Sequence, residues 1–274
     1  MPAKPSKVLL IRAEGKKYVT AAETTRNLKV AFSEKGIAVD DCDDGDVYDI
    51  AIAIGGDGTM MKAVTSLASR NIPTLGINAG DVGFLTTAEA TKWEQVVERI
   101  CSGNYVLEQR LGLELIANSE VVGPIANEVV LRHPYSVAVY EISIGGQVFY
   151  SNLMGDGVMV ATATGSTGYN TSANGPILLP SSSNVVVTPL NPMSLTTRPL
   201  VAEEVAQGKT ISVRLVESKK NQPIMIVADG VLQEKGLQVG DSVSLCKYGH
   251  ALLFATFGLG QYAKALTEKK GFAK

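Results

Sequence analysis

The decapeptide IAIAIGGDGT, residues 50–59, decides the fold of the first part of the chain. Its apolar start is typical of a short strand that is buried on both faces of a parallel sheet. Met61, Val64 and Leu67 follow at helical spacing, so we expect the strand to pass through a glycine turn directly into a helix. A turn with so few side chains exposes backbone N–H groups to an approaching phosphate, and Asp57 places one carboxylate within it.

The residues of this turn leave two interpretations open. Glycine-rich turns between a strand and a helix are common, and an Asp-Gly pair often serves only the geometry of a turn. The alternative is a site that holds phosphates, in which Asp57 handles a proton or a metal ion. The turn is not a Walker loop, because no Gly-Lys-Ser/Thr follows it, and it does not fit the fingerprint GxGxxG.

The chain has 274 residues and a formal net charge of −2. This length allows one large domain or two moderate ones with a sizeable core. The charge favours neither a nucleic-acid nor an anionic-membrane partner, and no apolar stretch approaches the length of a membrane span. Cys42, Cys101 and Cys246 are too scattered for a disulfide framework or a metal site, which favours a reducing cytoplasm.

Strands and helices alternate through the first part of the chain. The expected strands cover residues 8–11, 37–39, 50–54 and 72–77, and helices are expected over residues 18–33, after the turn at 55–59, and up to residue 100. Thr86 and Glu89 are expected to form a capping box at the start of this last helix. The turns at 55–59 and 78–84 both follow strands, and ligands bind at that edge of an open parallel sheet.

Aspartates crowd into residues 40–46, which read DDCDDGD. Such a cluster could hold a metal ion. Like charges without neutral ligands between them favour a solvated loop instead.

Short alternating runs bounded by turn residues dominate the chain from about residue 105. Gly145-Gly146 and Asp229-Gly230 suit tight hairpins between such runs. The expected strands cover residues 106–116, 129–131, 137–144, 148–150, 158–161, 185–188, 211–216, 224–228 and 243–246. We therefore predict an α/β domain at 1–104 with a Rossmann-like, mostly parallel sheet, and a β-rich domain at 105–250. A tail at 251–274, helical over residues 261–270, is expected to pack back on the first domain.

A second group of polar residues lies in the β-rich half. Residues 155–176 run from a strand of small and branched residues into an array of hydroxyls, amides and glycines. Small side chains let a flat heterocycle lie against the backbone, while hydroxyls and amides contact its edges and its sugar. A solvated polar loop is the alternative, but Tyr169 and the apolar residues 177–179 favour a folded segment. Asn127 and Glu128, just before a strand, could bind an amide edge and a ribose diol.

These motifs, taken in order, resemble the NAD kinase family. GGDG alone is shared with lipid kinases of the diacylglycerol and sphingoid type and with 6-phosphofructokinases, whereas the long TGSTGYN segment with NE upstream is far more specific to NAD kinases. The motifs are GGDGT at 55–59, GINAGDVGFL at 76–85, NEVV at 127–130, GDGVMVATATGSTGYNTSANGPI at 155–177 and TPLNPMSLTTRPLV at 188–201.

The resemblance implies two domains with the active site between them. It implies that NAD is phosphorylated on the 2′-hydroxyl of its adenosine ribose, which gives NADP. ATP is the implied phosphoryl donor, with polyphosphate as an alternative, and a divalent metal ion such as Mg²⁺ is the implied cofactor. The implied assembly is a homodimer or homotetramer.

The resemblance also assigns site residues. Asp57 matches the family's catalytic aspartate, and we expect it to accept the proton of the ribose hydroxyl, although a role as metal ligand is open. The phosphate side of the site is matched by Gly55, Gly56, Gly58 and Thr59. The NAD-binding positions are matched by Phe84, Asn127, Glu128, Asp156, Thr164, Thr167, Tyr169 and Ser172.

Two other functions remain as alternatives. A lipid kinase could share the GGDGT turn, but it needs an apolar crevice or a membrane-binding face, and it leaves the TGSTGYN array unexplained. A dinucleotide sensor without turnover could keep the adenosine site, although the presence of Asp57 in an intact turn argues against it.

Overall fold

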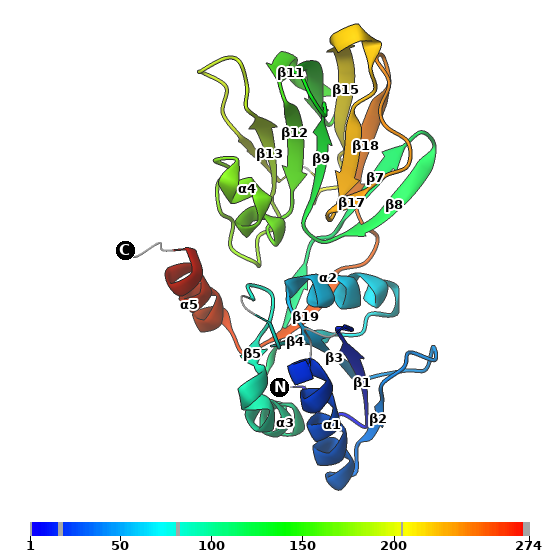
Figure 1. Ribbon diagram of the computed structural model, residues 1–274, viewed down its shortest axis with the longest axis vertical. Helices are drawn as coiled ribbons and strands as arrows, with labels where there is room; N and C mark the ends of the chain where they lie inside the picture. Colours follow the sequence, from blue (N-terminus) through cyan, green and yellow to red (C-terminus); the bar gives the residue numbers. More distant parts are fainter. Residues whose placement is uncertain (1, 16–18, 81–82, 204, 271–274) are drawn as a thin grey trace. The chain divides into compact units, whose positions relative to one another are not determined.

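The computed structural model describes residues 2–15, 19–80, 83–203 and 205–270 (Figure 1). The chain divides into two compact units, one of Met1–Gln109 with Leu252–Lys274 and one of Arg110–Ala251. Within the described ranges, no helix is long and apolar enough to cross a membrane. Tyr18, Asp81, Val82 and Gly271, which fall in or next to expected elements, lie outside the described residues.

The first unit is built on one seven-stranded sheet. Its strands are β1 (Lys7–Arg12), β2 (Ala38–Asp40), β3 (Ile50–Gly55), β4 (Thr74–Asn78), β5 (Ala88–Glu89), β6 (Val106–Arg110) and β19 (Leu252–Thr256). The strand order is β2-β1-β3-β4-β19-β6, with β5 beside β4. The pairs β1–β2, β1–β3, β3–β4, β4–β5 and β4–β19 are parallel, which confirms the mostly parallel sheet.

Helices cover both faces of this sheet, with α1 and α3 on one face and α2 on the other (Figure 1). The helices of this part of the chain are α1 (Val19–Glu34), α2 (Asp57–Ser66) and α3 (Trp93–Cys101), with short 3₁₀ turns η2 (Ala68–Arg70) and η3 (Ala90–Lys92), and α5 (Leu259–Lys270) follows β19. Val8 and Leu10 of β1 pack in one cluster with Phe32 of α1, whereas Leu9 packs in another with Leu67 at the end of α2. Successive strand residues point to opposite faces, so strands covered on both faces are continuous apolar runs.

The expected capping box of Thr86 and Glu89 is wrong. Residues 88–89 form β5, in which Glu89 lies opposite Asn78 of β4 and accepts a hydrogen bond from its Nδ2 at 2.9 Å. Glu89 does precede a helical turn, η3, but its side chain makes no capping bond there, and α3 begins only at Trp93. A strand pairing therefore uses the carboxylate that local spacing assigned to a helix terminus.

The second unit is a sandwich of two six-stranded sheets. One sheet has the order β11-β10-β15-β18-β7-β8, from β7 (Leu113–Ala117), β8 (Glu120–Ile125), β10 (Ala138–Ile144), β11 (Gln147–Gly155), β15 (Ile211–Ser218) and β18 (Ser242–Lys247). The other has the order β14-β13-β12-β9-β16-β17, from β9 (Glu128–Arg132), β12 (Gly157–Ala161), β13 (Val185–Leu190), β14 (Leu200–Ala202), β16 (Met225–Ala228) and β17 (Val231–Leu232). Short turns η4 (Gly165–Thr167), α4 (Tyr169–Ser172) and η5 (Lys219–Asn221) complete the unit.

One apolar core joins the facing sides of the two sheets. Leu115, Tyr140 and Leu245 of the first sheet belong to the same buried cluster as Val129 and Val160 of the second. The paired strands are antiparallel, so the prediction of a β-rich second part is confirmed.

Both predicted tight hairpins are present in the second unit. Ile144 pairs with Gln147 across Gly145-Gly146, and Ala228 pairs with Val231 across Asp229-Gly230. All four turn residues have positive φ, between 45° and 81°. This is the conformation that a two-residue hairpin of type I′ requires.

A single strand over residues 106–116 is wrong. The segment divides into β6, which belongs to the sheet of the first unit, and β7, which belongs to the second unit. Leu111 and Gly112 separate the two strands. Val106 and Leu107 of β6 are exposed, whereas Leu113 and Leu115 of β7 are buried in the core of the second unit, and the residue types alone do not show where the chain passes from one sheet to the other.

Candidate functional site

Asp57 is the first residue of α2, directly after the glycine turn that ends β3. Both of its carboxylate oxygens accept backbone hydrogen bonds from the second glycine turn. The Phe84 N–H donates to Oδ2 at 2.7 Å, and the Leu85 N–H donates to Oδ1 at 2.9 Å. A carboxylate has about four lone-pair sites, so each oxygen keeps capacity for one more donor or a metal ion. The turns at the ends of β3 and β4 thus meet at Asp57, as the sheet-edge argument expected.

The three glycines of the GGDG turn differ in how much space a side chain would have at each position. A Cβ at Gly55 would lie 2.4 Å from Oγ1 and 2.8 Å from Cβ of Thr59, so packing excludes a side chain there. At Gly56 and Gly58 a Cβ would meet nothing within 4 Å. Gly56 also has an ordinary extended backbone, with φ −99° and ψ −171°. Packing explains Gly55 alone, and the other two leave open space at the first turn of α2.

In the second unit, the turn before β9 packs directly on the turn after β12. The Thr162 hydroxyl donates to the Ala126 carbonyl at 2.6 Å, and the Thr162 N–H donates to the Asn127 carbonyl at 2.8 Å. A Cβ at Gly165 would lie 2.3 Å from that Asn127 oxygen. The structure therefore brings Asn127 and Glu128 together with the start of the TGSTGYN segment, as the predicted NAD-binding set requires.

Two buried polar atoms of this cluster lack hydrogen-bond partners among the described residues, Glu128 Oε2 and Thr164 Oγ1. A Cβ at Gly168 would lie 3.7 Å from Glu128 Oε2, which places this oxygen beside the glycine that follows η4. Burial, with a smaller contribution from the charge of Asp229, raises the pKa of Glu128 to about 7. Buried polar atoms are normally paired, so unpaired ones in a glycine-rich turn indicate a place for a polar ligand.

Asn170 organises the TGSTGYN segment and was not among the predicted site residues. It is fully buried and donates from Nδ2 to the carbonyls of Ser166 at 3.1 Å and Pro176 at 2.9 Å. Its Oδ1 accepts from the Thr188 hydroxyl at 2.6 Å, and a Cβ at Gly175 would lie 1.9 Å from this oxygen. The segment is folded around a buried amide and is not a solvated loop. An Asn among hydroxyls gives no local sign that it, rather than its neighbours, is buried.

The remaining predicted NAD-binding residues lie at different places in their own units. Thr167 is buried beside Thr164, whereas Tyr169 and Ser172 are exposed on α4. Asp156 precedes β12 and Thr164 follows it, so the two residues lie at opposite ends of a five-residue strand that is about 16 Å long. Its Oδ2 accepts from Asn191 Nδ2 at 2.8 Å. Phe84 is half-buried in the first unit, where its backbone holds Asp57. The NAD-binding roles of these residues stay predictions.

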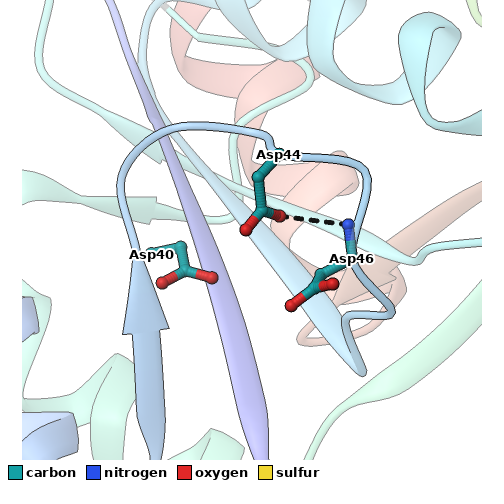
Figure 2. A group of neighbouring side chains, drawn as sticks. All are labelled: Asp40, Asp44 and Asp46. Carbon is teal, nitrogen blue, oxygen red and sulfur yellow. Dashed lines mark hydrogen bonds between the residues drawn. The ribbon is translucent and has the colours of Figure 1, made fainter.

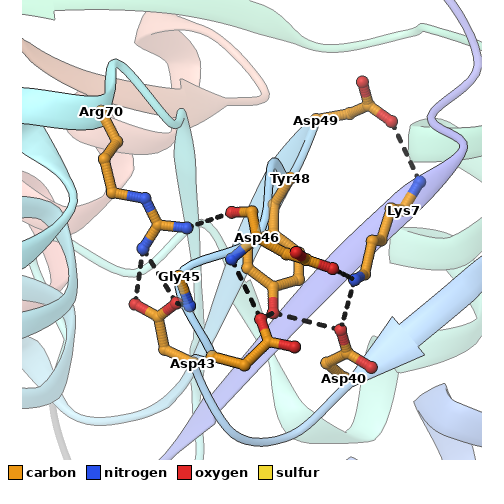
Figure 3. Close-up of polar contacts among 9 residues, drawn as sticks. Lys7, Asp40, Asp43, Gly45, Asp46, Tyr48, Asp49 and Arg70 are labelled. Carbon is orange, nitrogen blue, oxygen red and sulfur yellow. Dashed lines mark hydrogen bonds and ion pairs between the residues drawn. The ribbon is translucent and has the colours of Figure 1, made fainter.

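The aspartate loop places carboxylate oxygens of Asp40, Asp44 and Asp46 within 4.8 Å of one another (Figure 2). Lys7 Nζ lies 2.8 Å from Asp40 Oδ2 and also bonds Asp46, and the Tyr48 hydroxyl donates to Asp44 at 2.7 Å (Figure 3). The ammonium group of Lys7 thus already offsets part of the negative charge of the cluster.

Arg70 ties the same loop to η2. Its guanidinium bonds both carboxylate oxygens of Asp43, at 2.8 and 2.7 Å (Figure 3). These contacts give the loop a structural role that its residues explain without a metal ion.

Comparisons with known proteins agree with this arrangement. The family model described as ATP-NAD kinase N-terminal domain matches residues 12–105, and the one described as ATP-NAD kinase C-terminal domain matches residues 126–255. An NAD kinase of Cellvibrio japonicus is 31% identical over 248 residues, which cover 88% of this chain and 81% of that protein. An NAD kinase of Pseudomonas putida is 40% identical over 173 residues, which cover 61% of this chain but only 58% of the relative's length.

Solved structures share the fold over nearly the whole chain. Yeast NADH kinase complexed with NADH superimposes with a TM-score of 0.83 at 20% identity, over 98% of this chain and 89% of that one. An NAD kinase from Archaeoglobus fulgidus in complex with ATP superimposes with a TM-score of 0.74 at 20% identity, over 94% of this chain and 96% of that one. The motifs, the two family models and the Cellvibrio relative together establish that this chain belongs to the NAD kinase family.

Proposed function

We propose that this protein transfers a phosphoryl group from ATP to the 2′-hydroxyl of the adenosine ribose of NAD, which gives NADP. The observation that carries the proposal is the pair of buried atoms Glu128 Oε2 and Thr164 Oγ1 beside the Asn127–Glu128 turn, for which the described part of the chain supplies no hydrogen-bond partner. Ribose hydroxyls are donors and acceptors and would supply both atoms with partners. Membership in the NAD kinase family supports the same substrate.

Asp57 is the proposed general base. A ribose hydroxyl is a weak nucleophile at neutral pH, and a carboxylate within hydrogen-bond reach accepts its proton as it attacks phosphorus. The N–H groups of Phe84 and Leu85 hold this carboxylate in one orientation while each oxygen retains a lone pair. The open space at Gly56 and Gly58 lets phosphates approach the first turn of α2, whose N–H groups offset the charge of the transferred group.

A divalent metal ion fits this site as the implied cofactor. Mg²⁺ is usually held by one or two carboxylates together with substrate phosphates, and Asp57 is the carboxylate at the glycine turn. When bound, Mg²⁺ would offset the negative charge of the substrate phosphates. Asp57 would then hold the metal ion instead of, or before, accepting the proton. Polyphosphate stays an alternative donor, because the turn recognises phosphate oxygens and nothing in it is specific for adenine.

We further propose a homodimer or homotetramer in the cytoplasm. The assembly follows from the family resemblance. The reducing compartment is supported by Cys42, Cys101 and Cys246, none of which is in a disulfide in the described structure.

A coupled assay tests the proposed reaction. The purified protein is incubated with NAD, ATP and Mg²⁺, and NADP is measured with an NADP-specific dehydrogenase; we expect NADP to accumulate. Phosphorylation of a lipid in place of NAD would support a lipid kinase. NAD binding without NADP would support a sensor.

A further inference from the structure

Asp229 connects a hairpin turn to the turn that carries Asn127 and Glu128. Its Oδ2 accepts the Ala126 N–H at 2.7 Å, and its Oδ1 accepts the N–H groups of Asn127 at 2.7 Å and Glu128 at 3.1 Å. Its own N–H donates to the Glu128 carbonyl at 3.0 Å. One carboxylate thus receives three successive amides that lie more than 100 residues away in the sequence.

The arrangement constrains both the turn at Ala126 and the backbone of Asp229. Ala126 is fully buried, so its N–H would lose hydration without gaining a partner if the carboxylate were absent. Asp229 has a positive φ of 45°, which the tight Asp229-Gly230 hairpin imposes. Charge-assisted hydrogen bonds from several amides to one carboxylate are stronger than neutral ones and fix the direction of the peptide planes.

We propose that Asp229 is a positioning residue of the NAD site, and that its carboxylate fixes the Ala126–Glu128 turn so that Asn127 and Glu128 face the nucleoside. The inference rests on the proposed function for the identity of the ligand. Asp229 acts through the backbone of the turn, because both of its carboxylate oxygens accept amide groups of Ala126, Asn127 and Glu128.

Asp229 also sets the charge that Glu128 experiences. The segments against Glu128 contribute Ala161 of β12, Gly168 after η4, and Asp229 from the hairpin. Of these described neighbours, Asp229 is the ionisable one, and its charge adds to burial in raising the pKa of Glu128. The position of the turn and the titration of Glu128 are therefore coupled through one side chain.

The test compares Asp229→Asn with Asp241→Asn, a matched change at an exposed aspartate in a loop of the same unit. In Asp229→Asn we expect KM for NAD to rise about tenfold or more while kcat changes less than about threefold, since ground-state positioning is lost and Asp57 is untouched. We also expect the carboxyl midpoint of Glu128, followed by ¹³C NMR without NAD, to lie near the wild-type value of about 7 in Asp241→Asn and lower in Asp229→Asn.

Loss of the Asp229 charge lowers that midpoint and shows that the two carboxyl groups interact, whereas the separate responses of KM and kcat distinguish positioning from a purely structural role. If Asp229→Asn folds and keeps the wild-type KM for NAD, or if its kcat falls by as large a factor as its KM rises, the proposal is wrong. If this variant does not fold, amide hydrogen exchange in the wild-type protein decides. We expect slow exchange at Ala126, Asn127 and Glu128, and fast exchange at all three overturns the proposal. Failure of the proposed function is recognised separately, because wild-type protein would then form no NADP while the midpoint and the exchange rates remain measurable.

Discussion

Asp57 accepts one backbone N–H on each carboxylate oxygen, so Asp57→Asn keeps the size of the side chain but removes the base and leaves one of these two N–H groups without its acceptor. For Asp57→Asn we expect kcat to fall by about 10² or more, the usual effect of losing a general base, while KM for NAD stays close to the wild-type value. Steady-state kinetics with NAD and ATP measure both constants. Turnover near that of the wild type would remove Asp57 from the mechanism.

Glu128 makes the stability of the apoprotein depend on pH. Its pKa is about 7 in the folded state and near the ordinary value of 4.5 when unfolded, so the folded state binds the proton more tightly. The free energy of unfolding is therefore highest below pH 4.5 with respect to this group, and it falls as pH rises through about 7.

The Gln side chain in Glu128→Gln cannot ionise, so the free energy of unfolding of this variant should not fall with pH on account of position 128. Above pH 7 we expect the variant to exceed the wild type in free energy of unfolding by on the order of 2–3 kcal/mol, with the difference narrowing toward pH 4.5. Urea unfolding at several pH values measures it. If the difference in unfolding free energy between the variant and the wild type did not change with pH, the raised pKa of Glu128 would be contradicted.

At the level of elements, different glycines of the β3–α2 turn serve packing and the approach of the ligand. In Gly55→Ala the new Cβ would meet Thr59 at 2.4 Å, and we expect a loss of about 1–3 kcal/mol in unfolding free energy. In Gly56→Ala the Cβ meets nothing within 4 Å, so stability should change little while KM for ATP rises. Thermal melts and ATP kinetics on this matched pair provide the check, and equal losses of stability would refute it.

The sequence predicted most elements, because strands covered on both faces and tight hairpins have strong local signatures. The same signatures predicted Asp57 at a sheet edge, whereas the family resemblance is what grouped Asn127 and Glu128 with the polar segment. The sequence failed where distant residues decide. Glu89 pairs across β4 and β5, and Asp229 reaches amides more than 100 residues away. No local pattern encodes such partners, so these roles needed the structure.

At the scale of the whole molecule, the first unit depends on the end of the chain. β19 lies between β4 and β6, and Phe254 in its middle is fully buried. A chain that ends at Ala251 lacks this strand, and we expect its residues 1–109 to be cleaved rapidly by protease. A chain that ends at residue 258 keeps β19 and should resist.

The excised second unit provides the complementary measurement. Residues 110–251 contain both six-stranded sheets and the core between them. We expect this fragment to give a β-type circular dichroism spectrum and to unfold cooperatively. Protease resistance of residues 1–109 in the chain ending at Ala251 would show that β19 is dispensable.

The central position of β19 has a consequence for biosynthesis. Residues 1–109 leave the ribosome long before residues 252–256. The sheet of the first unit therefore cannot be completed until β19 has been synthesised. During that interval the edge of β4 that will receive β19 is exposed, and it is apolar and unpaired. The nascent chain is then most vulnerable to aggregation, and a chaperone that shields this edge until termination would raise the yield of active protein.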